Sequence, residues 1–290
     1  MKNQTISYLI QKGGAAKSAS SISSVSALQD LYKRAGLKEP KILIIDTDEQ
    51  NNIRTMFGVR SDNEKGSLYD IIVSNIDPIE AVTPVRESVW ILSSGGRKLN
   101  LFLQKMKNSI SPTETVEQIL NKKLQSLKPH FDYIFIDTPP SMGEMSAFSI
   151  LFSDYVIIPV PPDTLSMLAA KSTAVVVEGI AKTYKECNCQ IAGIMPVLFD
   201  KRRKLDTQLM ETLEHYIDQS VFGETAIMFN PIRTDSKMPT SVARKKLIGE
   251  VFPKSNVFCD YKHAMLKLLQ KILKDKNFTK LKLEETTVIH

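Results

Sequence analysis

The stretch that decides the fold is Gln11-Lys12-Gly13-Gly14-Ala15-Ala16-Lys17-Ser18, which follows a short apolar run from Ile6 to Ile10. A glycine-rich turn between a strand and a helix lets backbone N–H groups point inward and surround an anion. The helix that follows adds unpaired N–H donors and a partial positive charge. The stretch therefore predicts a phosphate-binding loop, in which Lys17 reaches the β- and γ-phosphates and Ser18 binds Mg²⁺.

The loop departs from the strict pattern G-x-x-x-x-G-K-[ST], because Gln11 and Ala16 stand where glycines are usual. Taken alone, it fits equally well a Gly-Gly turn before a helix rich in serine and alanine. If the backbone at Ala16 has a positive φ, the alanine costs roughly 1–2 kcal/mol. We therefore expect weakened nucleotide binding or slow turnover rather than loss of the site.

Two further apolar runs end in acidic residues. They are Ile42-Leu43-Ile44-Ile45-Asp46-Thr47-Asp48 and Tyr133-Ile134-Phe135-Ile136-Asp137. Apolar runs without alternation are typical of strands buried on both faces of a parallel sheet. Ligands bind such sheets beyond the carboxyl ends of the strands, where an acid beside a phosphate loop is a natural partner of Mg²⁺. The acids could instead form turns or helix caps, but three of them together with the loop favour a nucleotide site.

In this order, the motifs resemble those of the ParA/MinD group of deviant Walker A P-loop ATPases, in particular its plasmid and chromosome partition branch. That branch has a loop like Q-K-G-G-V-G-K-T, a D-x-D-x-Q-x-N segment and a D-x-P-P-S segment, which are similar to residues 11–18, 46–52 and 137–141 here. The segments Ile157-Ile158-Pro159-Val160 and Ile91-Leu92-Ser93-Ser94-Gly95 also look like segments of that family.

The resemblance runs from about residue 5 to about residue 275, and it implies an α/β fold of the P-loop NTPase type. We expect a single doubly wound, mostly parallel sheet of about seven to eight strands flanked by helices. The expected domain covers residues 1–275, followed by a C-terminal tail over 276–290. Strands are also expected over 191–198 and 226–229, and helices over 67–74, 113–127 and 167–182.

The resemblance also implies roles for individual residues. Lys12 matches the signature lysine of the family, which reaches the partner's phosphates across a nucleotide-sandwich dimer. Asp46 matches the acid that positions the attacking water, so the implied catalytic residues are Lys12, Lys17 and Asp46. The implied ATP-binding residues are Gly13, Gly14, Ala15, Ala16, Lys17, Ser18, Ala19 and, at the adenine, Asn230. Mg²⁺ would bind Ser18 and Asp137. The Asn230 match is looser, since Met228 and Phe229 replace the usual proline and arginine.

The chain carries a net charge of +6 and has a pI near 9.0. Basic residues gather in its C-terminal half, and in similar partition ATPases such residues bind DNA without sequence preference. The candidates are Arg202, Arg203, Arg233, Lys237, Arg244 and Lys245. Binding of this kind comes from phosphate neutralisation and weakens steeply with salt. The alternative is a solvated basic face with no ligand.

The implied function is a DNA-segregation ATPase that dimerises on ATP, binds DNA and acts with a small centromere-binding adaptor protein in the cytoplasm, at the nucleoid. One alternative is a pseudo-ATPase that holds nucleotide without turnover. Another is a MinD-like protein on a membrane, since an apolar stripe with lysines around it can lie on lipid. The stripe is Met265, Leu268, Leu269, Ile272 and Leu273. A closing helix packed on the sheet is the reading we expect, so a membrane partner is not expected.

Other classes of protein find little support in the sequence. Three cysteines give neither a disulfide framework nor a set of metal ligands. Residues 1–4 lead directly into a strand that is too short for a secretory signal. We see no apolar run that approaches the length of a membrane span.

Overall fold

The computed structural model describes residues 3–107 and 114–283. Its strands are β1 Gln4–Tyr8, β2 Ile42–Asp46, β3 Thr83–Arg86, β4 Val89–Leu92, β5 Tyr133–Asp137, β6 Tyr155–Val160, β7 Gln190–Phe199, β8 Ile227–Met228 and β9 Ile232–Arg233. Within the described residues they form one nine-stranded sheet, ordered β3-β4-β2-β5-β1-β6-β7-β8 with β9 beside β7. Only the β3–β4 pair is antiparallel. The mostly parallel sheet is confirmed, with one strand more than the upper expectation.

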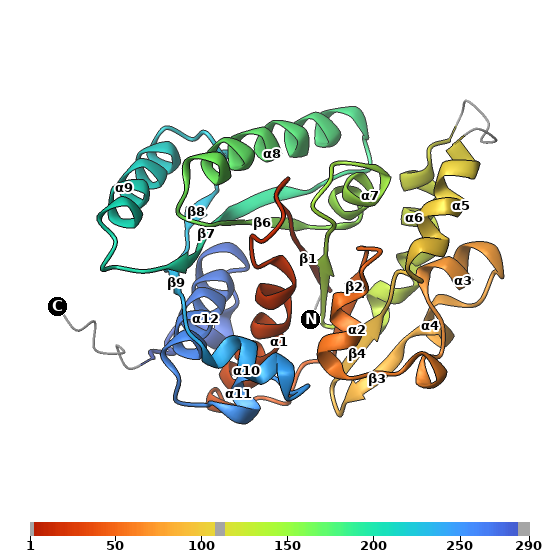
Figure 1. Cartoon of the computed structure of the whole chain (residues 1–290), viewed down its shortest axis with the longest axis horizontal. Helices are drawn as coiled ribbons and strands as arrows, with labels where there is room; N and C mark the ends of the chain where they lie inside the picture. Colours follow the sequence, from red (N-terminus) through yellow and green to blue (C-terminus); the bar gives the residue numbers. More distant parts are fainter. Residues whose placement is uncertain (1–2, 108–113, 284–290) are drawn as a thin grey trace.

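Helices cover both faces of the sheet (Figure 1). They are α1 Lys17–Arg34, α2 Asn52–Phe57, α3 Leu68–Val73, α4 Pro78–Ala81, α5 Arg97–Lys107, α6 Val116–Leu124, α7 Glu144–Phe152, α8 Thr164–Thr183, α9 Lys204–Asp218, α10 Lys237–Ala243, α11 Ile248–Val251 and α12 Asn256–Lys267. The helices expected over 67–74 and 167–182 are α3 and α8. The helix expected over 113–127 is α6, followed by a 3₁₀ segment over Gln125–His130; Thr113 lies outside the described residues.

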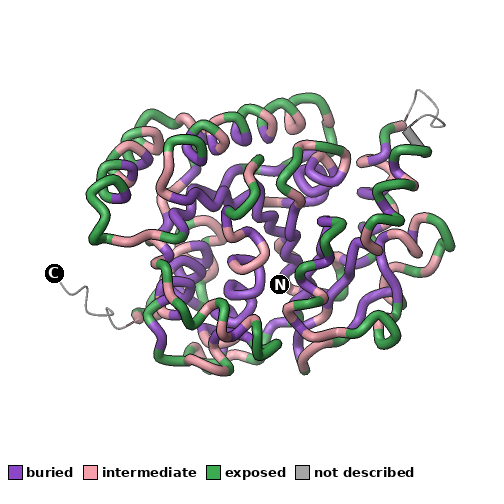
Figure 2. Tube along the Cα trace, viewed as in Figure 1, coloured by how far each residue is buried: buried purple, intermediate pink, exposed green. Residues whose placement is uncertain are grey.

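Each central strand is buried on both of its faces, as the unalternated apolar runs predicted. In β2, Ile42 and Ile44 pack on the α1 side, whereas Leu43 and Ile45 pack with α3 and α6 on the other side. The helices present their exposed surfaces outward and the sheet lies inside (Figure 2). The loops at the carboxyl ends of the central strands are therefore the part of the sheet that a ligand can reach.

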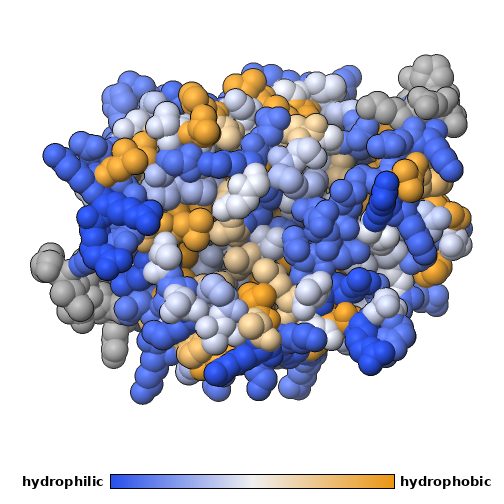
Figure 3. Space-filling model, viewed as in Figure 1, coloured by the Kyte–Doolittle hydropathy of each residue, from blue (hydrophilic) through white to orange (hydrophobic). Residues whose placement is uncertain are grey.

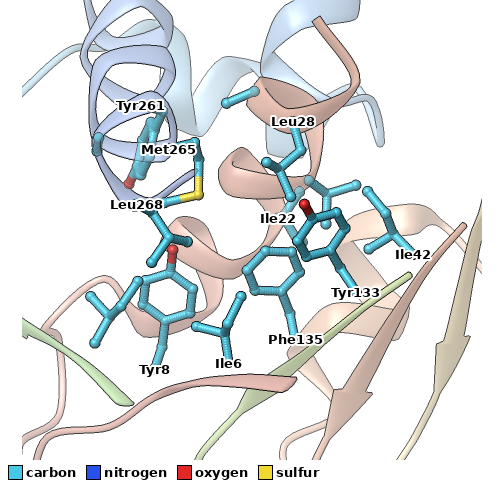
Figure 4. Packing of buried hydrophobic residues seen from close by; sticks show 14 of the residues in the cluster. Ile6, Tyr8, Ile22, Leu28, Ile42, Tyr133, Phe135, Tyr261, Met265 and Leu268 are labelled. Atoms are coloured by element: carbon cyan, nitrogen blue, oxygen red, sulfur yellow. The ribbon is translucent and has the colours of Figure 1, made fainter. Parts of the chain in front are cut away.

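The apolar stripe near the C-terminus belongs to a closing helix and not to a free surface. Met265, Leu268 and Leu269 are buried against α1 and the sheet, where Tyr8 and Phe135 point toward them (Figure 4). Buried hydroxyls in this layer are paired: Tyr8 Oη and Ser24 Oγ lie 2.5 Å apart. A buried hydroxyl is tolerated when it is hydrogen-bonded, so the serine-rich α1 can be a core helix.

The packed structure continues beyond residue 275. The Phe278 ring is fully buried, 5.0 Å from the Tyr32 ring between centroids. Leu281 and Leu283 also pack against the same core cluster. Residues 276–283 of the expected tail therefore pack against the domain. Residues 284–290 lie outside the described residues.

Among the described residues, one helix, α8, is long and apolar enough to span a membrane by length and composition alone. This differs from the expectation that no such run exists. The helix packs against β6, β7 and α7, as expected for a crossover helix of a parallel sheet. Its outer surface carries the exposed side chains of Leu165, Leu168 and Val175, and apolar atoms gather along this edge in Figure 3.

Candidate nucleotide-binding site

The loop over residues 11–16 connects β1, between β5 and β6 in the sheet, to α1. Gly14 has φ 72°, and a Cβ added to Gly13 or Gly14 would meet no atom within 4 Å. The Lys17 side chain turns back across the loop, where Nζ donates to the carbonyl of Lys12 (2.8 Å) and to that of Ile10 (3.4 Å). An ammonium group therefore lies inside the loop, as phosphate binding requires.

Burial lowers the pKa of Lys17, although the nearby Asp137 and Asp48 carboxylates oppose this effect. The charged lysine is thus stabilised mainly by these two acids and by two carbonyl groups. A bound phosphate would bring further negative charge to the same ammonium group, because phosphate oxygens accept hydrogen bonds strongly. The loop and the strand-end acids consequently act as one electrostatic unit.

Ala16 has the left-handed conformation that its place in the loop suggested. It is the N-cap of α1, with φ 54° and ψ 25°, and its side chain makes no capping hydrogen bond. Alanine in this region costs roughly 1–2 kcal/mol. Because the folded loop has this conformation, the strain at Ala16 is a cost that folding carries.

Ala16→Gly is accordingly expected to raise the free energy of unfolding by about 0.5–1 kcal/mol, the relief of strain less the larger backbone entropy of glycine. The Kd for ATP should change by less than about threefold if folding carries the whole of this cost. Urea denaturation and ATP titration measure the two quantities. Ala15→Gly is the control, because Ala15 is buried and lacks a positive φ.

A tenfold gain in ATP affinity from Ala16→Gly, without a gain in stability, would show that the strain arises on binding instead. ATP hydrolysis by the same variant separates the two activity hypotheses. A large gain in turnover supports the pseudo-ATPase, and little change supports a working ATPase.

Asp137 is the residue of the site with the least satisfied side chain. It ends β5 opposite Asp46 at the end of β2, and neither of its buried oxygens has a hydrogen-bond partner among the described residues. Burial raises the pKa of Asp137 to about 7, opposed by the Ser18 hydroxyl and the Lys17 ammonium. The Ser18 hydroxyl thus lies near the carboxylate, without meeting hydrogen-bonding geometry.

A buried carboxylate is costly unless a cation or a donor meets it. Mg²⁺ takes oxygen ligands and is commonly held by one or two carboxylates together with substrate phosphates. Asp137 and Ser18 supply such oxygens, and the described residues contain no group of three or more histidine, cysteine or acidic side chains that could hold a metal by themselves. The residues present therefore fit a magnesium ion that arrives with a nucleotide.

The two acids of the 46–52 segment have different surroundings. The Asp46 carboxylate is fully buried and accepts the backbone N–H groups of Asp48 and Ile53, both at 3.0 Å. Burial, followed by the proximity of Asp137, raises the pKa of Asp46 well above its usual value. Asp46 therefore shapes its loop, and each of its oxygens already accepts one backbone N–H.

Asp48 is better placed than Asp46 to meet a ligand. The family resemblance, which gave this role to Asp46, did not identify it. One oxygen accepts the Gln50 N–H at 3.1 Å, and in the described part of the chain the other accepts no hydrogen bond. The Ser94 hydroxyl donates to the Asp48 carbonyl at 2.8 Å and steadies this loop. The signal was present in the D-x-D spacing, which contains both acids, but sequence spacing does not distinguish the capped acid from the open one.

Lys12 forms an ion pair within its own chain. Its Nζ donates to both Asp163 oxygens, at 2.8 and 2.7 Å, and to Ser166 Oγ at 2.6 Å. Burial tends to raise the pKa of Asp163, but hydrogen bonds from Lys12 and Ser166 outweigh it and the pKa lies below its usual value. Both side chains remain partly exposed, at 29% and 42%. A solvated pair is weak, so Lys12 can exchange partners at small cost.

Asp163 was not identified from the sequence, although it caps α8 by accepting the Ser166 N–H at 2.9 Å. The remaining nucleotide candidate, Asn230, is exposed on the loop between β8 and β9. Its side chain makes no hydrogen bond within the described residues. The structure thus brings Lys12, Lys17, Ser18, Asp46 and Asp137 together, and leaves Asn230 on a neighbouring strand-end loop.

Three of the basic candidates, Arg202, Arg203 and Arg233, come together through the pairing of β7 with β9, which places Phe199 opposite Arg233. The loop that carries Arg202 and Arg203 connects β7 to α9 and therefore begins beside Arg233. Several of these cations already face acids of the same chain: Arg202 pairs with Asp200, Arg233 with Asp260 and Lys237 with Asp235.

The other basic candidates have freer side chains. Arg203 and Lys245 are exposed and, in the parts of the chain described, form no ion pair. The Arg244 guanidinium lies 5.7 Å from the centre of the Phe252 ring. Arg203 and Lys245 are therefore the candidates that DNA phosphates could reach without breaking an existing contact.

Comparison with known proteins gives consistent matches. Residues 3–192 match the AAA_31 family, described as an AAA domain. The sporulation initiation inhibitor protein Soj of Bacillus subtilis (strain 168) is 26% identical over 213 residues, 73% of this chain and 79% of Soj. The fold is similar to apo McdA from Cyanothece, with a TM-score of 0.76 at 19% identity over 90% of this chain and 98% of McdA.

A plasmid partition protein from Borrelia burgdorferi B31 bound to AMPPNP has a similar fold as well. The TM-score is 0.72 at 22% identity, over 93% of this chain and all of that chain. The region matched by the family model contains the phosphate loop, both acids of the 46–52 segment, Asp137 and Asp163. The site described above and the family match therefore concern the same part of the chain.

Proposed function

Because this chain belongs to the AAA_31 family of AAA domains and is a ParA-like partition ATPase, we propose that ATP holds it as a dimer on DNA and that hydrolysis releases it. The observation that carries the proposal is the buried, unpaired Asp137 carboxylate beside Lys17 and Ser18 at the mouth of the phosphate loop. Such a site is complete only with a cation and an anionic ligand.

The chain's own groups have defined tasks in hydrolysis. Loop N–H groups and Lys17 would hold the β- and γ-phosphates, and Ser18 with Asp137 would hold a magnesium ion, whose charge would offset that of the phosphates. Asp48 orients a water and accepts its proton as that water attacks the γ-phosphorus, while the bond from the γ-phosphorus to the bridging oxygen breaks and ADP leaves. Asp46 fixes the loop that carries Asp48. Catalysis then consists mainly of positioning and electrostatic stabilisation.

Dimerisation is proposed to depend on Lys12. In the single chain its ammonium is neutralised by Asp163. In the dimer it would leave this solvated pair and meet the phosphates of the partner's nucleotide, which carry more negative charge. ATP occupancy and dimerisation would then be one coupled event. We propose that a small centromere-binding adaptor protein acts on this dimer, and that the protein works in the cytoplasm at the nucleoid.

Non-specific DNA binding is the part of the proposal that is easiest to test. Arg203→Glu and Lys245→Glu, together, should weaken binding of a random-sequence duplex about tenfold or more at 100 mM salt, and should flatten its salt dependence by about two in the log–log slope. Fluorescence anisotropy with ATP measures both. Lys38→Glu is the control, because Lys38 is also exposed and lies at the amino end of β2, away from the loops that follow β7 and α10.

The DNA-binding proposal fails if the double variant binds as the wild type does, or if wild-type binding is independent of salt. The glutamate variants at 203 and 245 are preferred to a change at Arg233, whose removal would leave the buried Asp260 without its partner. A MinD-like membrane role receives no support from the C-terminal stripe, since Met265, Leu268 and Leu269 are buried and Ile272 and Leu273 pack against the same core. Flotation with liposomes, with and without ATP, tests that alternative directly.

A further inference from the structure

Arg233 is held by one acid of its own chain through three hydrogen bonds. Its Nε donates to Asp260 Oδ2 at 2.8 Å, its Nη2 donates to Oδ1 at 2.7 Å, and its backbone N–H donates to Oδ2 at 3.1 Å. The Asp260 side chain is 8% exposed and that of Arg233 is 36% exposed. A bidentate guanidinium–carboxylate pair is the geometry that arginine also uses for phosphate.

The neighbouring Arg202–Asp200 pair shows what is particular about Arg233. Arg202 is also held in a bidentate manner, but its side chain is 85% exposed. An exposed pair contributes little free energy and exchanges readily with other ions. The Arg233–Asp260 pair is half-buried and therefore harder to exchange, so Arg233 is withheld from solution more firmly than Arg202.

The helix that carries Asp260 also contacts the phosphate-loop helix. Tyr261, the next residue on α12, places its hydroxyl 3.0 Å from Ser20 Oγ in α1. Ser20 lies in the first turn of α1, where its N–H donates to the Ala16 carbonyl at 2.8 Å. Adjacent residues of α12 thus contact the nucleotide end of α1 and the arginine of β9, and α1 and α12 pack along their lengths.

We propose that Asp260 occupies Arg233 in place of a DNA phosphate, and that the Ser20–Tyr261 contact ties the release of Arg233 to the state of the phosphate loop. The inference rests on the proposed DNA binding and adds its regulation. With Asp260 in place, Arg233 contributes no net positive charge to the basic surface. When α12 shifts with the first turn of α1, the pair opens and Arg233 joins Arg203, on the neighbouring loop, in binding DNA.

Asp260→Asn tests the first part, since it removes the charge and retains the shape. Without nucleotide, its affinity for a random-sequence duplex should rise about tenfold, and the log–log salt slope should steepen by about one, the increment for one added phosphate contact. Asp260→Asn combined with Arg233→Gln should lose this gain. Asp200→Asn is the matched control and should change nucleotide-free binding less than twofold.

Tyr261→Phe tests the second part, because it removes the contact with Ser20 and leaves the Arg233–Asp260 pair intact. It should reduce the ATP stimulation of DNA binding at least threefold, with ATP affinity unchanged. A merely structural pair would give Asp260→Asn a lower melting temperature with an unchanged salt slope, and this result would overturn the proposal.

The failures of the proposal and of the proposed function are distinguishable. If the wild type binds DNA with ATP but Asp260→Asn binds no better than the wild type without nucleotide, the inference about Asp260 is wrong and the function stands. If the wild type never binds DNA while Asp260→Asn does, the inference that Asp260 withholds Arg233 stands and the ATP-dependent function is wrong. If neither protein binds DNA, both are wrong.

Discussion

Asp48→Ala is expected to reduce ATP turnover by about 100-fold or more, while the Kd for ATP with Mg²⁺ changes less than about threefold. The reason is geometric: Asp48 has an oxygen left for a water, whereas both Asp46 oxygens accept backbone N–H groups. Steady-state phosphate release gives the turnover, and titration with labelled ATP gives the affinity. The variant should accumulate in its ATP-bound form.

Asp46→Ala should behave differently, because it leaves the N–H groups of Asp48 and Ile53 without their acceptor. It is expected to lower the free energy of unfolding by about 1–3 kcal/mol and to lose turnover as a consequence. Asp62→Ala, a change of an exposed acid outside the site, is the control for both variants. If Asp46→Ala lost turnover at full stability while Asp48→Ala kept it, Asp46 would be the residue that positions the attacking water, as the resemblance to the ParA/MinD group implied.

Asp137→Asn is expected to stabilise the nucleotide-free protein and to weaken ATP binding in Mg²⁺ at least tenfold. Since the pKa of Asp137 is raised to about 7 in the folded state, folding favours its protonated form. Its contribution to stability is full below the unfolded pKa near 4 and is lost as pH rises toward 7. The gain from the asparagine at pH 8 is up to about 4 kcal/mol, for three pKa units.

Thermal unfolding in EDTA measures this effect. The melting temperature of the wild type should fall between pH 5 and pH 8, and the fall should be shallower for Asp137→Asn. Asp62→Asn should follow the wild type at every pH. Adding ATP and Mg²⁺ should raise the melting temperature of the wild type more than that of Asp137→Asn. Equal pH slopes for the two proteins would mean that Asp137 is not the buried acid that titrates.

Much of the fold followed from local patterns. The runs 42–45 and 133–136 predicted strands buried on both faces, because a parallel sheet leaves no polar face to its central strands. The turn at Gly13-Gly14 and the lysine after it predicted the strand–loop–helix order. Asp46, Asp48 and Asp137 were expected beside the phosphate loop, because the carboxyl ends of parallel strands lie at the same edge of the sheet. The strands β3 and β9 were not expected, and β9 has only two residues.

Side-chain contacts between segments that are distant in the sequence could not be predicted from such patterns. Asp163 meets Lys12 across 151 residues of sequence, and Tyr261 meets Ser20 across 241. Arg233 was chosen as a DNA contact because it is basic, yet its charge is met by Asp260. Charge and position in the sequence do not show which acid lies beside which base.

The sequence by itself determined the sheet, the phosphate loop and the set of acids beside it, because these depend on burial periodicity and on backbone geometry near each residue. The tertiary structure alone decided which of those groups are open to a ligand. Asp46 and Asp48 differ by two positions, but the fold caps one with two N–H groups and leaves an oxygen of the other open. The physical reason is that hydrogen-bond partners and burial, which set whether a charged group can act, come from segments that only folding brings together.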